Sequence, residues 1–190
     1  MFTFGIALIL MMGVQSCKKE CDVVPKDSQP NQLGGLFNFA TFKVDKQGSG
    51  IYEYGCLFKP KVNGKVTALS CLMPDIDIYS VVLWDSASKT VLANENINNL
   101  DTLKANSKSI SPIAVNAGKT YLISVKSVNK RWFNFTTLAG GAIKYPLSNQ
   151  YISVTGYLWK GTTLSGAPQF PLSKDNSYVA GLADFSFQPD

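Results

Sequence analysis

The chain of 190 residues is 45% hydrophobic and 16% charged, and its 18 basic and 13 acidic side chains give a formal net charge of +5. It contains no histidine, the most common general base near neutral pH, so Ser-His and Cys-His nucleophile pairs are excluded. The basic excess comes from scattered lysines and a single arginine, which predicts a solvated surface rather than the arginine-rich patch typical of nucleic-acid sites.

The N-terminus begins with an apolar run, FTFGIALILMMGV, from Phe2 to Val14. The run is shorter than the ~20 residues of a membrane-spanning helix and matches the ~7–15 apolar residues of a secretion signal. Basic residues normally precede such a run, and their absence here leaves the position of the start codon open.

Val14 and Ser16 are followed at once by Cys17, the order seen at bacterial lipoprotein processing sites. Residues 1–16 are therefore predicted to be a lipoprotein signal peptide, and Cys17 the lipid-attachment residue, acylated on its thiol and its amine. Two or more acyl chains hold a protein stably on a bilayer, since each buried methylene contributes ~0.8 kcal/mol. We expect an outer-membrane lipoprotein on the periplasmic or cell-surface face, held by lipid rather than by a helix.

The cysteines do not favour a metal site. Besides Cys17, the chain has only the thiols of Cys21, Cys56 and Cys71, whereas a structural zinc site needs about four thiolate or imidazole ligands at paired spacings. Neither a metal nor another cofactor is expected.

Residues 17–35 mix charge with Pro, Gln, Asn and Gly and contain little that could be buried, which is typical of a flexible tether. Aromatic and β-branched residues begin after Gly34 and Gly35. The following segment, 36–190, is long enough for one ordinary domain with a core. We therefore expect one globular domain behind a lipidated tether.

That domain is predicted to be all-β, because short strand-like runs alternate with turn signals and no stretch has a sustained helical period. Turn chemistry is explicit at Asn63-Gly64, Ala117-Gly118 and Gly140-Gly141, where a positive φ is accessible. The expected strands are Phe37–Val44, Tyr52–Lys61, Lys65–Met73, Ile78–Asp85, Thr90–Asn96, Ser107–Ile113, Lys119–Val128, Trp132–Leu138, Tyr151–Trp159 and Tyr178–Phe187. Such a succession predicts a single two-layer antiparallel β-sandwich of jelly-roll or immunoglobulin-like type.

Four segments carry a family resemblance: FKPKVNGKVTAL (58–69), YSVVLWDSASKTVLAN (79–94), AVNAGKTYLISV (114–125) and QFPLSKDNSYVAGLADFSF (169–187). In order and spacing they resemble the strand pairs and closing segment of the bacterial β-sandwich family known as domain of unknown function 4082, here carried on a Gram-negative lipoprotein. The resemblance implies a secreted or surface domain of the kind found beside carbohydrate-active or adhesive modules. It implies no catalytic residue.

Cys56 and Cys71 bear on how the second and third expected strands pair. If Asn63-Gly64 closes a two-residue hairpin, Cys56 lies directly opposite Cys71 at ~4.5–5.5 Å between Cα atoms, within disulfide range. Pro60 opposes this register because it lacks an N–H for the ladder, and a three-residue loop would shift the cysteines by one position. A Cys56–Cys71 disulfide and two buried free thiols are therefore both open.

Asp75 and Asp77 are the carboxylates that could suggest catalysis. A glycosidase needs two carboxyl groups facing each other across a sugar, about 5 Å or ~6.5–9.5 Å apart, inside a cleft. Nothing in the segment PDID predicts a cleft, so a turn or loop role is favoured, with a weak calcium contact as the lesser alternative. No catalytic residue is assigned.

Aromatic side chains are the candidates for a binding site. Alternation along the strand 151–159 predicts an inner face of Ile152, Val154 and Leu158 and a water-facing side of Tyr151, Ser153, Thr155, Tyr157 and Trp159. In the segment RWFNFTT, Phe133 and Phe135 are expected to point inward and Trp132 outward. Aromatic faces beside amides and hydroxyls suit sugars. The alternative is a satellite core, in which loop 139–150 or 160–175 folds over these rings. Trp84 is assigned to packing or turn support.

Two functions of different class follow from these observations. The first is a non-catalytic module of the cell envelope that binds a glycan or another surface ligand through Tyr151, Tyr157, Trp159 and Trp132, on rings that are exposed and roughly coplanar. The second is a structural or scaffolding subunit of an envelope assembly, in which a sheet edge or flat face docks a partner chain. Neighbouring genes for polysaccharide uptake would favour the first function, and genes for a pilus or secretion system the second.

Overall fold

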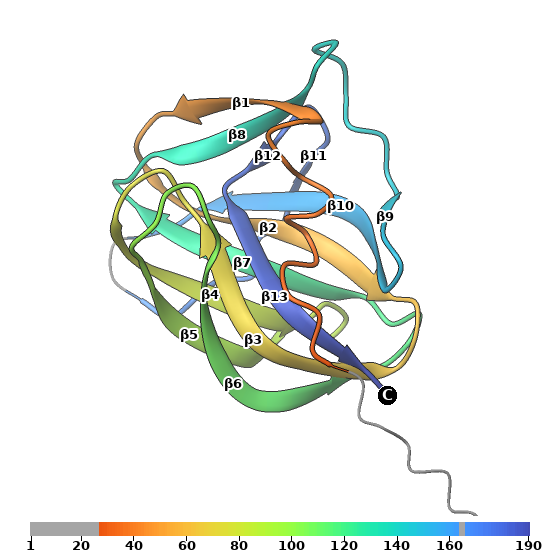
Figure 1. Cartoon of the computed structure of the whole chain (residues 1–190). Helices are drawn as coiled ribbons and strands as arrows, with labels where there is room; N and C mark the ends of the chain where they lie inside the picture. The colour runs from red at the N-terminus through yellow and green to blue at the C-terminus, as the bar shows by residue number, and fades with distance from the viewer. Residues whose placement is uncertain (1–26, 164–165) are drawn as a thin grey trace, which may run out of the picture.

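The computed structural model describes residues 27–163 and 166–190, and these residues form strands and connections without a helix (Figure 1). The strands are β1 (Phe42–Gln47), β2 (Ile51–Pro60), β3 (Gly64–Leu72), β4 (Asp77–Asp85), β5 (Thr90–Asn99), β6 (Asn106–Val115), β7 (Tyr121–Val128), β8 (Trp132–Thr137), β9 (Leu147–Ser148), β10 (Ile152–Gly161), β11 (Ser173–Asp175), β12 (Val179–Ala180) and β13 (Leu182–Pro189). The signal peptide predicted for residues 1–16 and the lipid-attachment residue Cys17 lie outside the described residues.

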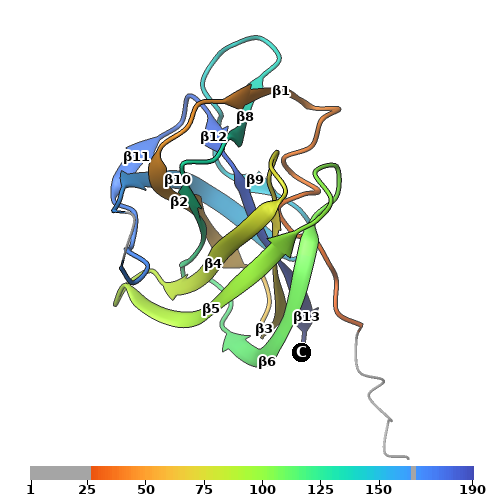
Figure 2. The ribbon, with the colours of Figure 1, turned by 90° about the vertical axis from the view of Figure 1, so that its left-hand side faces the viewer.

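Antiparallel sheets pack together in this domain. The largest is a seven-stranded sheet in the order β11-β10-β2-β7-β4-β5, with β9 beside β10. A three-stranded sheet, β13-β3-β6, packs against it, and a second three-stranded sheet, β1-β8-β12, lies at one end (Figures 1 and 2). The prediction of an all-β antiparallel sandwich is confirmed, and the small end sheet is the part that the expected strands did not reveal.

The main core lies between the seven-stranded sheet and the sheet β13-β3-β6. Tyr54, Cys56 and Phe58 alternate along β2, and each is at most 2% exposed, as expected where side chains of one strand point alternately to opposite faces. The ring of Phe58 lies 4.4 Å, centroid to centroid, from Phe185 of β13. Aromatic packing of this kind joins the two layers directly.

A second, smaller core covers the outer face of the seven-stranded sheet. Its buried apolar members are Val82, Trp84, Leu122 and Leu158, with Leu57 and Phe170 packed against them.

A chain of hydrogen bonds runs through this outer core. The Trp84 indole Nε1 donates to Ser124 Oγ at 2.8 Å, and Ser124 Oγ donates to Glu53 Oε1 at 3.0 Å. Glu53 Oε2 accepts from the backbone N–H of Gln169 at 2.7 Å. Trp84 therefore packs, as expected, and the fully buried Glu53 fastens the loop around Gln169 to the sheet.

The turn at Asn63-Gly64 does not close a hairpin, because β2 and β3 belong to different sheets. Neither residue has the positive φ that a type I′ turn requires. Instead, Asn63 Oδ1 accepts from the Ala117 N–H at 2.8 Å, and the chain turns a corner from one layer to the other. The expected opposition of Cys56 and Cys71 is therefore wrong.

The two cysteines have other partners in the ladders. Cys56 pairs with Ile123 and Tyr157, and Cys71 pairs with Asn106 and Ala183. Both are buried free thiols, the second of the two alternatives left open by the sequence, rather than a disulfide. Burial raises the pKa of both thiols, which keeps them protonated and inert.

The domain begins earlier than the boundary predicted at residue 36. Leu33 and Phe37 are buried in the main core, and Gln29 forms a β-bridge with Phe187. The carboxylate of Asp184 holds this N-terminal arm, with Oδ1 accepting from Leu33 N at 2.8 Å and Oδ2 from Gly34 N at 2.7 Å. The tether assignment for residues 27–35 is therefore corrected, because one buried leucine and one buried carboxylate are enough to fix a polar segment.

The last expected strand, Tyr178–Phe187, is broken in two at Gly181. This glycine has a φ of +58°, and a Cβ atom there would lie 2.2 Å from Cε2 of the Tyr54 ring. The break allows β12 to pair with β8 in the end sheet while β13 pairs with β3. Glycine is needed here for both its conformation and its size.

We expect Gly181→Ala to destabilise the fold by about 2–4 kcal/mol, the combined cost of left-handed backbone in alanine and of overpacking against a buried ring. Gly118→Ala is the matched control, since Gly118 has a φ of +75° but a Cβ atom added to it would meet nothing within 4 Å. It should cost only the backbone contribution of about 1 kcal/mol. Urea unfolding of both variants measures the difference, and equal losses would contradict the close contact with Tyr54.

A pH effect is expected from Asp184, because burial raises its pKa from 3.8 to about 6. Between these pH values the Asp184 carboxyl is protonated in the folded state and ionised in the unfolded state. The contribution of Asp184 to the free energy of unfolding therefore falls as the pH rises and is lost above about pH 6. At ~1.36 kcal/mol per pKa unit, the change is at most about 3 kcal/mol.

Asp184→Asn keeps the shape of the side chain and removes the titration. The unfolding free energy of the wild type minus that of Asp184→Asn should therefore decrease between pH 4 and pH 7 in urea titrations. An increase over this range would mean that the N–H bonds to the carboxylate outweigh its burial.

Candidate ligand-binding site

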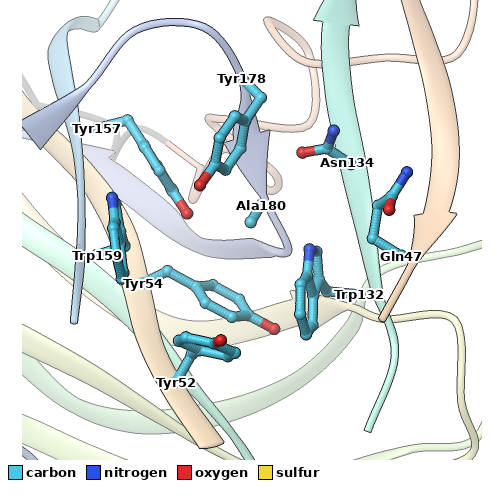
Figure 3. Close-up of a pocket in the computed structure, with 9 residues that line it drawn as sticks. All are labelled: Gln47, Tyr52, Tyr54, Trp132, Asn134, Tyr157, Trp159, Tyr178 and Ala180. Atoms are coloured by element: carbon cyan, nitrogen blue, oxygen red, sulfur yellow. The ribbon is translucent and has the colours of Figure 1, made fainter. Parts of the chain in front are cut away.

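A pocket of about 350 Å³ lies where the seven-stranded sheet meets the end sheet (Figure 3). Most of its lining consists of aromatic side chains of β2, β8 and β10 and of the segment leading into β12, and β1, β8 and β12 contribute the other residues. The lining residues are Gln47, Tyr52, Tyr54, Trp132, Asn134, Tyr157, Trp159, Tyr178 and Ala180.

A β-bulge in β10 brings Tyr157 and Trp159 into this pocket. The register with β2 shifts between Val154 and Gly156, so Thr155 is an extra residue. Because alternation is reset after a bulge, Tyr157 pairs with Cys56 and faces the core side.

The bulge also corrects the faces expected for Tyr157, Leu158 and Trp159 in β10. Tyr157 is 0% exposed rather than water-facing, and Leu158 lies in the small outer core rather than on the inner face with Ile152 and Val154. Trp159 stands opposite Tyr54 on β2 and is half-buried.

Simple alternation holds in β8. Phe133 and Phe135 are buried, as expected, and pack in the core beneath the end sheet. Trp132 and Asn134, on the other face, are half-buried and line the pocket. Trp132 therefore lies on the opposite face of β8 from Phe133 and Phe135, as expected, but that face lines the pocket and packs against the main core rather than facing open water.

The aromatic rings cross one another rather than forming a flat platform. Tyr52 and Trp132 lie 5.4 Å apart, centroid to centroid, at 76° between planes. Tyr52 and Trp159 lie 6.2 Å apart at 67°, and Tyr54 and Trp132 lie 6.0 Å apart at 56°. Tyr52 thus crosses both tryptophans at steep angles, and the geometry is that of a box. The expectation that all four predicted rings are exposed is wrong, since Tyr157 is 0% exposed.

The pocket contains polar groups that have no partner. Tyr54 is 2% exposed and Tyr157 is 0% exposed. Their hydroxyl oxygens make no hydrogen bond to any of the described residues. The side chain of Ser127 lies near the Tyr54 hydroxyl, and the backbone of Ala180 lies near the Tyr157 hydroxyl. In Figure 3 the ring of Tyr54 extends toward Trp132 and the hydroxyl end of Tyr157 points toward the middle of the group of lining residues, although both hydroxyl oxygens are buried. Burial raises the pKa of both phenols, so both stay neutral.

Tyr151 does not belong to this pocket. It precedes the bulge, and its ring lies 5.9 Å from that of Phe187, centroid to centroid, at the other end of β10. Of the four residues predicted to bind a ligand, the structure therefore brings together Trp132, Tyr157 and Trp159, and it separates Tyr151.

Sequence reasoning missed Tyr52, Tyr54 and Tyr178 as pocket residues. The pattern Tyr-x-Tyr at the start of β2 puts Tyr52 and Tyr54 on one face, which is a readable signal. Tyr178 carries no such signal, because its position depends on the break at Gly181 and the pairing of β12 with β8.

The two aspartates of the PDID segment have a structural role. Asp75 accepts from the backbone N–H of Arg131 at 2.8 Å and from its side-chain Nε at 2.9 Å, and Asp77 forms an ion pair with Lys130. Hydrogen bonds from the Arg131 side chain hold the pKa of Asp75 below its ordinary value. These pairs fasten the connection between β3 and β4 to the turn between β7 and β8.

No set of three His, Cys, Asp or Glu side chains in the described ranges, 27–163 and 166–190, could hold a metal ion. A membrane-spanning helix is likewise not found in the described part of the chain.

Comparison with known proteins adds no relative. The sequence matches no protein-family model, and a search of the curated proteins finds no match. The resemblance to the domain of unknown function 4082 family therefore stays a prediction.

Proposed function

We propose that this protein is a non-catalytic lipoprotein of the cell envelope whose β-sandwich binds a glycan through the aromatic pocket. The observation that carries the proposal is the box of crossing rings formed by Tyr52, Trp132 and Trp159 around buried phenol hydroxyls. Sugars present apolar C–H faces and hydroxyl edges, which such rings and hydroxyls match.

The surroundings of the pocket support binding rather than catalysis. None of the described residues that line it is an acidic or basic side chain such as Asp, Glu, Lys or Arg. The buried carboxyl of Glu53 lies in the small outer core and is used by Ser124 and Gln169. A binding role needs only the shape and the hydrogen-bonding groups that are present.

The envelope location in this proposal rests on Cys17 and the apolar run before it. A diacylated or triacylated Cys17 would hold the domain at the outer membrane, and the sandwich itself would then project from the bilayer. The partners implied are the membrane, through lipid, and a surface or periplasmic glycan.

Trp132→Ala and Trp159→Ala should each weaken glycan binding about tenfold or more, because each removes one wall of the box. Tyr151→Ala is the matched control, since it removes an aromatic ring just before β10, outside the pocket. Glycan-array binding and polysaccharide gel shifts measure the effect. Loss of binding in the control alone, or in none of the three variants, would argue against the pocket as the site.

Cys17→Ser should release the chain from the membrane fraction and abolish acylation, because serine offers no thiol for the lipid. Cys21→Ser, four residues further along, should leave both unchanged. Mass spectrometry of the mature N-terminus and cell fractionation are the measurements. An uncut, unmodified N-terminus in the wild type would refute the lipoprotein assignment.

A further inference from the structure

We propose that the pocket takes a single neutral sugar unit at the end of a glycan chain, and that the Tyr54 and Tyr157 hydroxyls are its buried hydrogen-bonding groups. This inference rests on the function proposed above and adds the class of sugar and the mode of binding. Four features of the pocket carry it: the unpartnered hydroxyls, the charge of the lining, the size and the ring angles.

The hydroxyls of Tyr54 and Tyr157 point to a ligand with hydroxyl groups. A buried hydroxyl without a partner is costly, and native proteins rarely leave one in this state without a reason. Each phenol can donate one hydrogen bond and accept others, so a sugar hydroxyl fits either role. Two unpartnered hydroxyls in one pocket therefore favour a ligand whose polar atoms hydrogen-bond to them.

The lining excludes charged ligands. Its polar side chains are the neutral amides of Gln47 and Asn134 and the neutral phenols. A carboxylate, phosphate or ammonium group placed here would lose its hydration without gaining a counter-charge, which is strongly unfavourable. The sugar is therefore an uncharged one, rather than a uronic acid, a phosphorylated sugar or an amino sugar.

Size and shape favour one terminal ring. The volume of about 350 Å³ is at the small end of the ~300–1,000 Å³ typical of ligand pockets. Rings inclined at 56–76° to one another enclose a unit from several sides, whereas the flat surface of a long polysaccharide needs coplanar rings. The fully buried Tyr157 closes off one side of the pocket.

A quaternary ammonium group is the competing occupant of an aromatic box. Such a cation cannot donate or accept a hydrogen bond, so it would leave the hydroxyls of Tyr54 and Tyr157 unpartnered. It would also find no carboxylate among the described lining residues. The orphan hydroxyls therefore favour the neutral sugar.

The test uses the full-length chain in detergent, titrated calorimetrically and by tryptophan fluorescence. The probes are the methyl glycosides of glucose, galactose, mannose and N-acetylglucosamine, compared with glucuronate, glucosamine and choline, and with long neutral polysaccharides. We expect at least one neutral methyl glycoside to bind. Its charged counterparts should bind at least tenfold more weakly, because a charged group would lose its hydration in the pocket without gaining a counter-charge.

The decisive variants are Tyr54→Phe and Tyr157→Phe, which remove one oxygen each. Each should weaken binding of the neutral glycoside about tenfold, while the stability of the free protein stays equal or rises, because an unpartnered buried hydroxyl is gone. Tyr145→Phe is the matched control: its hydroxyl is also buried and unpartnered among the described residues, but it does not line the pocket. It should leave binding unchanged.

The outcomes separate this inference from the proposed function. Tighter binding of choline or a charged sugar, binding of long polysaccharides alone, or undiminished binding by both phenylalanine variants would overturn the neutral terminal unit, while binding that depends on Trp159 would still support a ligand-binding module. Failure of every probe, polysaccharides included, would overturn both.

Discussion

The β-bulge at Thr155 sets the direction of every side chain in the second half of β10. One extra residue opposite Leu57 and Phe58 resets the alternation, so that Tyr157 and Trp159 face β12 and β8 instead of the outer surface. Without it, these rings would lie where Leu158 lies, over the small outer core. The box of aromatic rings, and with it the proposed binding function, depends on this single insertion in the ladder.

Two glycines, one of them at the interruption between β12 and β13, make room for the aromatic box. Gly181 lets the chain leave the end sheet and enter β13 while its backbone passes against the Tyr54 ring. Gly55, beside Tyr54 on β2, leaves no space for a Cβ atom, which would lie 2.0 Å from the carbonyl oxygen of Ile123. The Tyr54 ring is thus confined by the backbone at Gly181 and by the side chain of Trp132, while Gly55 lets β2 lie close against β7.

Much of the fold could be read from the sequence, because period-two alternation and turn residues identify strands directly. The strands around Phe58, Val81 and Ile123 lie close to their expected bounds, and the inward direction of Phe133 and Phe135 followed from alternation alone. What failed depended on pairing between distant segments. The bulge at Thr155 is visible only against β2, and local residues do not reveal that Asn63-Gly64 turns a corner between layers.

The candidate site was only partly predictable for the same reason. Trp132, Tyr157 and Trp159 were identified by residue type, although the faces assigned to Tyr157 and Trp159 were wrong. The N-terminal arm was wrongly predicted as a tether because the average composition of a segment does not show single residues that fix it. Burial of Leu33 and the hydrogen bond from its N–H to the buried carboxylate of Asp184 hold the arm on the domain although most of its residues are polar. Buried carboxylates recur in this domain as fasteners of polar segments, since Glu53 holds the backbone near Gln169 in the same way.

The placement of the N-terminal arm has a geometric consequence for a membrane-attached chain. The arm enters beside the C-terminal end of β13, where Gln29 meets Phe187, and Asp190 reaches back to Asn63 just beyond β2 (Figure 1). Tyr52 stands at the far end of β2, roughly 25 Å away at ~3.3 Å per residue. If the chain is anchored to a bilayer through its N-terminus, the end of the domain that carries the aromatic pocket would lie on the side away from the bilayer and be accessible to ligands in solution.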